Sequence, residues 1–142
     1  MKPKPTYRVL VCDDLEMARQ QVRQVLANSS EFQVVGEAAG AQESIEKVSH
    51  LKPDLVLMDV CLPDLDGAEA TRQILLRAPE TKVLAYSADS CWEKVDRMLA
   101  AGACGYVVKR ADLEELVRAA RTVLLGGHYL SLTLLQSVES RD

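Results

Sequence analysis

The stretch KPDLVLMD, residues 52–59, decides the fold of this chain of 142 residues. Pro53 interrupts the segment before it, and the four apolar residues that follow have no polar residue among them. Such a short, continuous apolar run is typical of a strand that is covered on both faces of a parallel sheet. Asp59 follows this run directly. The stretch therefore predicts a buried strand that ends in a carboxylate.

Three further apolar runs also end in polar residues that can carry chemistry. Residues 9–12 are followed by Asp13 and Asp14, residues 83–86 by Ser87, and residues 105–108 by Lys109. Open α/β sheets bind ligands outside the carboxyl ends of their strands, so we expect these side chains to meet in one crevice. Clustered carboxylates indicate a cation site beside a reactive acid, and a lysine opposite them indicates an anionic ligand.

Segments with helical periodicity alternate with the apolar runs, which predicts an α/β fold with a doubly wound parallel sheet. We expect a further strand at 32–37 and helices at 15–28, 41–50, 67–78, 90–101 and from Asp112, a plausible N-cap, to about 125. Residues 1–125 are expected to form one domain. Residues 126–142 are too few for a second core and are interpreted as a linker or tail.

The composition excludes several classes of protein. A net charge of -4 and an isoelectric point near 5.2, without a basic stripe, oppose nonspecific binding of nucleic acid. The four cysteines form no Cys-x-x-Cys pair and are expected to remain free thiols. No run approaches the roughly 18 apolar residues of a membrane span. A cytoplasmic location without membrane association is therefore expected.

These residues resemble the receiver domain of two-component response regulators, the CheY-like domain, over about residues 7–125. The spacing matches as well as the residue types, because Ser87 and Lys109 follow Asp59 by 28 and 50 residues. The stretches GEA at 36–38 and GGHYLS at 126–131 further resemble the NarL/FixJ subfamily of transcriptional regulators. The resemblance implies a flavodoxin-like sheet of five strands in the order 2-1-3-4-5, flanked by five helices.

The resemblance also implies a chemical role for each residue of the acidic end of the sheet. Asp59 would accept a phosphoryl group from a sensor histidine kinase. Asp14, Asp59 and the backbone carbonyl of Cys61 would bind Mg²⁺ or Mn²⁺ directly, and Asp13 would hold the ion through water. Lys109 would pair with the phosphoryl oxygens.

Two residues are expected to convert phosphorylation into a conformational change. Ser87 would donate a hydrogen bond to the phosphoryl group, and Tyr106 would rotate into the space that this movement vacates. Such a chain is a signalling phosphoacceptor that promotes its own phosphorylation and dephosphorylation, and not an enzyme with a separate substrate. Its output would reach DNA only through a C-terminal domain that is absent from this chain. A stand-alone receiver that signals by protein contact is the alternative, and homodimerisation is left open.

Each residue also has a simpler structural interpretation. A lone Asp59 would more often cap a helix or end a turn, and only its four partners reverse that judgement. Asp13 and Asp14 would suit a helix N-terminus, which is compatible with metal binding. Lys109 could be a solvated charge and Tyr106 a fixed aromatic side chain.

Residues near the predicted site have open interpretations. Turn chemistry accounts for Asp64 and Asp66. Asp89 could orient a water molecule near the site, and Trp92 could belong to the core or anchor a partner. Two features depart from the family pattern: Arg110 stands where many receivers have proline, and Ser87 replaces the more frequent threonine.

Two other classes of function compete with the receiver. A phosphohydrolase with an aspartate nucleophile usually has a second Asp two residues later, where this chain has Cys61, and a cap insertion that this chain lacks. A nucleotide or flavin binder would need a glycine-rich phosphate loop after the first strand. Asp13 and Asp14 stand there instead and would repel a phosphate.

Overall fold

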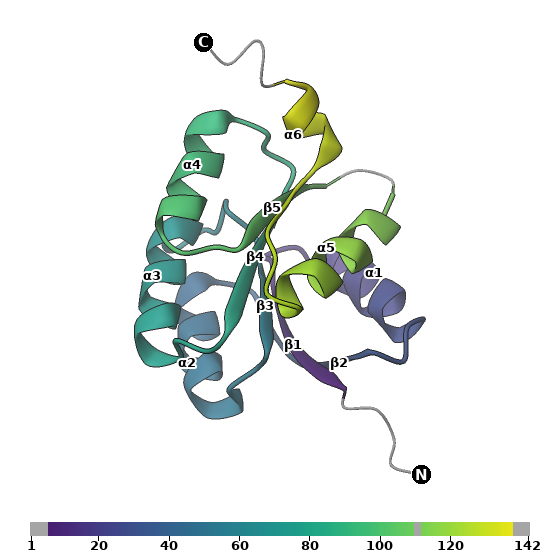
Figure 1. The fold of residues 1–142 in the computed structure, drawn as a ribbon. Coiled ribbons are helices and arrows are strands. Elements are labelled where there is room, and N and C mark those ends of the chain that lie inside the picture. Colours follow the sequence, from purple (N-terminus) through teal and green to yellow (C-terminus); the bar gives the residue numbers. More distant parts are fainter. Residues whose placement is uncertain (1–5, 110–111, 138–142) are drawn as a thin grey trace.

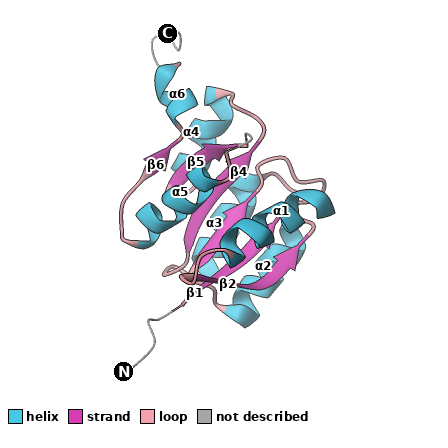
Figure 2. Cartoon of the chain, turned by 90° about the vertical axis from the view of Figure 1, so that its right-hand side faces the viewer, coloured by secondary structure: helices cyan, strands magenta, loops and turns pink. Residues whose placement is uncertain are grey.

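The computed structural model describes residues 6–109 and 112–137 and has three layers, with one parallel sheet between two layers of helices (Figures 1 and 2). Six strands lie in the order β2-β1-β3-β4-β5-β6, and every pair is parallel. The strands are β1 (Tyr7–Cys12), β2 (Phe32–Ala38), β3 (Leu55–Met58), β4 (Lys82–Ser87), β5 (Gly105–Val108) and β6 (Tyr129–Leu130). The helices are α1 (Glu16–Ala27), α2 (Ala41–Leu51), α3 (Gly67–Arg77), α4 (Trp92–Ala100), α5 (Glu114–Leu124) and α6 (Leu132–Gln136).

The central strands alternate between two hydrophobic cores, one on each face of the sheet. In β3, Leu55 and Leu57 pack with α1 and α5, whereas Val56 and Met58 pack with α2, α3 and α4 (Figure 1). Both faces are covered because each parallel connection returns across the sheet through a helix. This explains why residues 55–58 form an unbroken apolar run.

The sheet confirms the predicted flavodoxin-like order 2-1-3-4-5 and extends it by one strand. Five strands and five helices were expected, but the described residues contain one more of each. Strand β6 pairs with β5, and α6 follows it. The alternation of apolar residues could not indicate a strand as short as Tyr129–Leu130. Gly105 makes room for it, since a Cβ at this position would lie 2.4 Å from the Tyr129 carbonyl oxygen. The proposed division of the chain at residue 125 stays a prediction.

The helix boundaries differ from the expectations by small shifts with local causes. Helix α4 begins at Trp92 and not near residue 90, because the Asp89 carboxylate accepts a hydrogen bond from Cys91 N at 2.9 Å and holds a turn there. Asp112 is not the N-cap of α5, which begins at Glu114 after Leu113. The Asp112 carboxylate instead accepts a hydrogen bond from Glu114 N at 3.0 Å. Arg110 and the tail beyond residue 137 lie outside the described residues.

The topology brings the ends of β1, β3, β4 and β5 to one edge of the sheet. Neighbouring strands pair so that Cys12 lies beside Met58 and Ser87 beside Val108. The polar residues at the ends of these strands therefore reach the same edge. Within the described ranges, none of the helices combines the length and the apolar character that crossing a bilayer requires.

Candidate functional site

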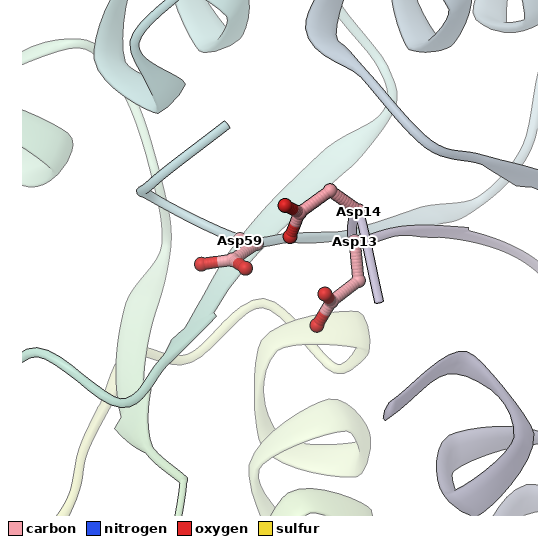
Figure 3. Close-up of side chains that lie close together, drawn as sticks. All are labelled: Asp13, Asp14 and Asp59. Atoms are coloured by element: carbon pink, nitrogen blue, oxygen red, sulfur yellow. The ribbon is translucent and has the colours of Figure 1, made fainter. Parts of the chain in front are cut away.

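Three carboxylates gather at the carboxyl edge of the sheet. Asp13 and Asp14 follow β1 and Asp59 follows β3, and one oxygen from each lies within 4.8 Å of the others (Figure 3). Asp13 and Asp59 are buried, whereas Asp14 is exposed. Carboxylate oxygens are hard donors of the kind that Mg²⁺ and Mn²⁺ prefer. The donor set therefore fits a divalent cation of this type.

Lys109, which follows β5, supplies a positive charge to this cluster. Its ammonium group contacts the Asp13 carboxylate and lies 3.4 Å from Asp59 Oδ2. It also lies 5.5 Å from the centre of the Tyr86 ring, whose face favours a cation. Both carboxylates are less than 10% exposed, so water screens these interactions only in part.

The pKa of the Asp59 carboxyl is raised above its ordinary value of 3.8. Burial is the largest cause, and the charge of Asp13 adds to it, whereas Lys109 and a hydrogen bond from Cys61 N act in the opposite direction. That hydrogen bond joins Cys61 N to Asp59 Oδ1 at 3.2 Å. A desolvated carboxylate that is held by a backbone amide is a more available nucleophile than a fully hydrated one.

Ser87, the last residue of β4, and Tyr106 of β5 share one partner, Asp89. Ser87 Oγ accepts a hydrogen bond from Asp89 N at 3.2 Å, and the Tyr106 hydroxyl donates to the Asp89 carbonyl oxygen at 2.5 Å. Both side chains are buried. Burial raises the pKa of Tyr106 to about 12, and a hydrogen bond with Ser87 offsets part of this effect. The hydroxyl groups of Ser87 and Tyr106 are thus linked to each other and to the loop before α4.

Beside the carboxylates, the loop between β3 and α3 borders a hollow of about 510 Å³. Asp14 and Cys61 line one side of this hollow, and Lys94 and Arg97 of α4 line another. The Lys94 ammonium lies 3.5 Å from Cys61 Sγ and 2.7 Å from Asp89 Oδ2. The hollow is therefore open to solvent next to the acidic cluster, and the two cations of α4 that line it are each paired with an aspartate.

The structure brings part of the predicted set of residues together, and the functional roles of all of them stay predictions. Asp13, Asp14, Asp59 and Lys109 are in mutual proximity, and Cys61 is bonded to Asp59 through its backbone N–H. Ser87 and Tyr106 are turned toward Asp89.

Sequence reasoning missed two further contributors to this region. Lys94 gave no signal in the sequence, because it reaches Asp89 and Cys61 only through the position of α4. Asp64, interpreted as a turn residue, accepts hydrogen bonds from Ala41 N and Gln42 N at the start of α2. An aspartate that caps a helix far from it in the sequence has no local signature.

Solved structures with the same fold come from signalling proteins of one class. A two-component response regulator of the LuxR family from Aurantimonas sp. SI85-9A1 superposes with a TM-score of 0.90 at 32% identity, covering 96% of this chain and 97% of that one. The receiver domain of the response regulator NarL from Mycobacterium tuberculosis gives a TM-score of 0.82 at 31% identity, covering 87% and 99%. Fold and site thus define the class of two-component response regulators.

Residues 9–121 match the family described as the response regulator receiver domain, and the chain belongs to this family. It is 43% identical over 131 residues to the response regulator GacA of Pseudomonas viridiflava, covering 92% of this chain. It is 37% identical over 136 residues to the response regulator VraR of Staphylococcus aureus (strain Mu3), covering 96% of this chain. The matches span 61% and 65% of the lengths of these relatives. The predicted resemblance to NarL/FixJ-type regulators is confirmed.

Proposed function

We propose that Asp59 is the phosphoacceptor of this receiver domain and that a sensor histidine kinase is the donor. One Asp59 oxygen forms a bond to phosphorus while the phosphorus–nitrogen bond of a phosphohistidine breaks. The electron pair leaves with the imidazole nitrogen, which takes up a proton. The observation that carries this assignment is the burial of Asp59 beside Asp13, Asp14 and Lys109.

Charge neutralisation is the main requirement of this reaction, because a carboxylate must approach an anionic phosphoryl group. Asp14, Asp59 and the backbone carbonyl of Cys61 would bind Mg²⁺ or Mn²⁺, with Asp13 acting through water. The ion, when bound, offsets negative charge on the phosphoryl oxygens. Lys109 contributes a second positive charge, since its ammonium group contacts Asp13 and lies 3.4 Å from Asp59 Oδ2.

Ser87 and Tyr106 are suited to transmit the phosphorylated state to the surface. Ser87 Oγ accepts from Asp89 N, so its own O–H can be donated to a phosphoryl oxygen. A shift of the Asp89 loop would then break or weaken its hydrogen bond with the Tyr106 hydroxyl. Phosphorylation biases this equilibrium because Ser87 and Lys109 bind the phosphoryl group better in one of the two states.

The output of the domain is proposed to be transcriptional. The solved relative from Aurantimonas is described as a two-component response regulator of the LuxR family, and a structure from Staphylococcus aureus as a DNA-binding response regulator of that family. The acidic charge of this chain opposes DNA binding by the receiver itself. DNA contact would therefore depend on a separate C-terminal domain. The receiver domain also promotes its own dephosphorylation, because the hollow beside the carboxylates is open to solvent and admits water.

Phosphorylation by a small donor tests the assignment directly. With Mg²⁺ and acetyl phosphate, intact-mass spectrometry should show one phosphoryl adduct that hydroxylamine removes, as expected for an acyl phosphate. Asp59→Asn should abolish the adduct. Asp54→Asn is the matched control, because Asp54 precedes the same strand at its opposite end and Asn retains an acceptor for Arg8 N. An adduct that persists in Asp59→Asn would show that another residue is the acceptor.

A further inference from the structure

The C-terminal segment, residues 129–137, joins two parts of the molecule that the proposed switch would move apart. At its start, β6 pairs with β5, so that Tyr129 lies beside Gly105 and Leu130 beside Tyr106. At its end, the segment contacts the first residue of α4, because Trp92 Nε1 donates a hydrogen bond to Ser137 Oγ at 3.0 Å. In Figure 1, α6 lies next to the beginning of α4 and the end of β5.

The first half of the segment is fixed to the sheet through Ser131. Its N–H donates to the Tyr106 carbonyl oxygen at 3.1 Å, and its Oγ accepts from Val108 N at 2.9 Å and donates to Glu115 Oε1 at 3.1 Å. Ser131 and Leu134 are each 1% exposed. Breaking these bonds would leave buried polar groups without partners, which is costly. This half therefore stays with β5 and α5.

The other contact of the segment depends on the loop before α4. Cys91 N donates to Asp89 Oδ1 at 2.9 Å, so the start of α4 is tied to Asp89. The backbone of Asp89 is bonded in turn to Ser87 Oγ and to the Tyr106 hydroxyl. Because Trp92 is the next residue after Cys91, a displacement at Ser87 reaches it through four residues of chain.

We propose that the hydrogen bond between Trp92 and Ser137 holds the C-terminal segment against α4 in the unphosphorylated protein, and that phosphorylation releases it. This inference rests on the proposed function. When the Ser87 hydroxyl turns toward a phosphoryl oxygen, the loop at Asp89 shifts and the first turn of α4 moves with it. Ser131 keeps the rest of the segment on the sheet. The contact between Trp92 and Ser137 spans the two parts and is therefore broken.

The hydrogen bond between Trp92 and Ser137 should also affect the rate of phosphorylation, because the coupling between the two is reciprocal. A bond that exists in only one state stabilises that state, so its removal favours the other. Ser137→Ala removes the hydroxyl that accepts from the Trp92 indole and that also donates to the Leu134 carbonyl oxygen. A typical net hydrogen bond corresponds to roughly a fivefold change in an equilibrium constant. Ser137→Ala should therefore be phosphorylated by acetyl phosphate up to about fivefold faster than the unaltered chain.

The indole N–H of Trp92 offers a direct probe, because the chain contains one tryptophan. Its single ¹H–¹⁵N indole signal reports how fast this proton exchanges with water. We expect exchange to accelerate roughly fivefold when Mg²⁺ and acetyl phosphate are added, in step with the phosphoryl adduct measured by mass spectrometry. Asp59→Asn should show no acceleration.

Two variants separate the contact from a general loosening of α6. Ser137→Ala should exchange rapidly before phosphorylation and show little further change. Thr133→Ala is the matched control, since it removes another hydroxyl from α6, where Thr133 is exposed, and should behave like the unaltered chain. Circular dichroism establishes that both variants are folded.

Each outcome decides the proposal. Accelerated exchange in the phosphorylated chain, together with faster phosphorylation of Ser137→Ala, supports it. Unchanged or slower indole exchange in a fully phosphorylated chain overturns it and leaves the proposed function intact. Equal phosphorylation rates for Ser137→Ala and Thr133→Ala also overturn it. If no adduct forms at all, the proposed function itself fails and the device has no trigger.

Discussion

The positive charge of Lys109 has opposite effects on metal binding and on phosphoryl transfer. Lys109 contacts Asp13 and lies 3.4 Å from Asp59, so it offsets the repulsion between these buried carboxylates. The same charge opposes the binding of a metal cation beside these carboxylates. In phosphoryl transfer, however, a fixed positive charge near the phosphoryl oxygens is favourable. Lys109 should therefore be dispensable for metal binding and necessary for the reaction.

Replacing Lys109 with methionine separates these two effects. Lys109→Met should bind Mg²⁺ at least as tightly as the unaltered chain in calorimetric titration. Its phosphorylation by acetyl phosphate should slow on the order of a hundredfold, the loss typical for one preorganised charged donor. Lys82→Met, at the opposite end of the neighbouring strand β4, is the control and should change neither quantity. A parallel loss of Mg²⁺ affinity and rate would contradict this role of Lys109.

At the scale of elements, the loop between β3 and α3 is held near its α3 end by two carboxylates that bind helices. Asp66 caps its own helix α3 through Glu69 N and pairs with Arg97 of α4. Asp64 reaches helix α2, where its two oxygens accept from Ala41 N at 2.8 Å and from Gln42 N at 3.0 Å. The loop that carries Cys61 is thus attached to three helices, and its position beside Asp59 follows from these attachments.

The cap from Asp64 predicts an acid-dependent part of the stability. Hydrogen bonds from Gln42 N and Ala41 N lower the pKa of Asp64 below its ordinary value of 3.8. Its stabilising effect is therefore complete above that value and is lost as the pH falls through the lower pKa of the folded state. Asp64→Ala should lower the free energy of unfolding by about 1 kcal/mol at neutral pH. Urea denaturation should detect this loss.

The pH dependence distinguishes the cap from simple packing. The difference between Asp64→Ala and the unaltered chain should shrink as the pH falls toward about 2, because the protonated carboxyl no longer accepts both amides well. Asp64→Asn retains one acceptor oxygen and should lose less stability than the alanine variant. A difference that is constant from neutral to acidic pH would mean that the Asp64 carboxylate is not the stabilising group.

At the scale of the whole molecule, the parallel topology explains which features could be predicted. Asp13, Asp59, Ser87 and Lys109 each follow an apolar run, and a parallel sheet brings all strand ends of one direction to one edge. Their convergence therefore required only the correct fold class. Strand β6 could not be predicted in this way, because two residues give no alternation and the strand depends on a tertiary fit against Gly105.

The contacts that could not be predicted from the sequence depend on the positions of whole helices in the fold. Glu115 of α5 accepts hydrogen bonds from the Tyr129 hydroxyl and from Ser131 Oγ, both at 3.1 Å, and so fixes the start of the C-terminal segment. Trp92 and Ser137 are 45 residues apart and meet only because the end of α6 lies near the beginning of α4. Nothing local in the sequence marks such pairs, since each side chain alone suits a solvated position.

The acidic cluster also links metal binding to the stability of the whole fold. One oxygen from each of Asp13, Asp14 and Asp59 lies within 4.8 Å of the others, and their mutual repulsion destabilises the folded state. A divalent cation that binds only the folded chain raises the free energy of unfolding by about 2.7 kcal/mol at one hundred times its dissociation constant. Magnesium chloride should therefore shift the urea midpoint upward, and a chelator should reverse the shift.

Substitution of the exposed carboxylate tests this linkage with the least disturbance of the core. Asp14→Asn should lose most of the shift caused by Mg²⁺, because an amide oxygen is a weaker ligand for a hard cation and one negative charge is removed. Glu80→Gln removes an exposed charge in the loop before β4, away from the cluster, and should retain the full shift. Sodium chloride at equal ionic strength corrects for screening. If Asp14→Asn were stabilised as much as the unaltered chain, the cation would have to bind elsewhere.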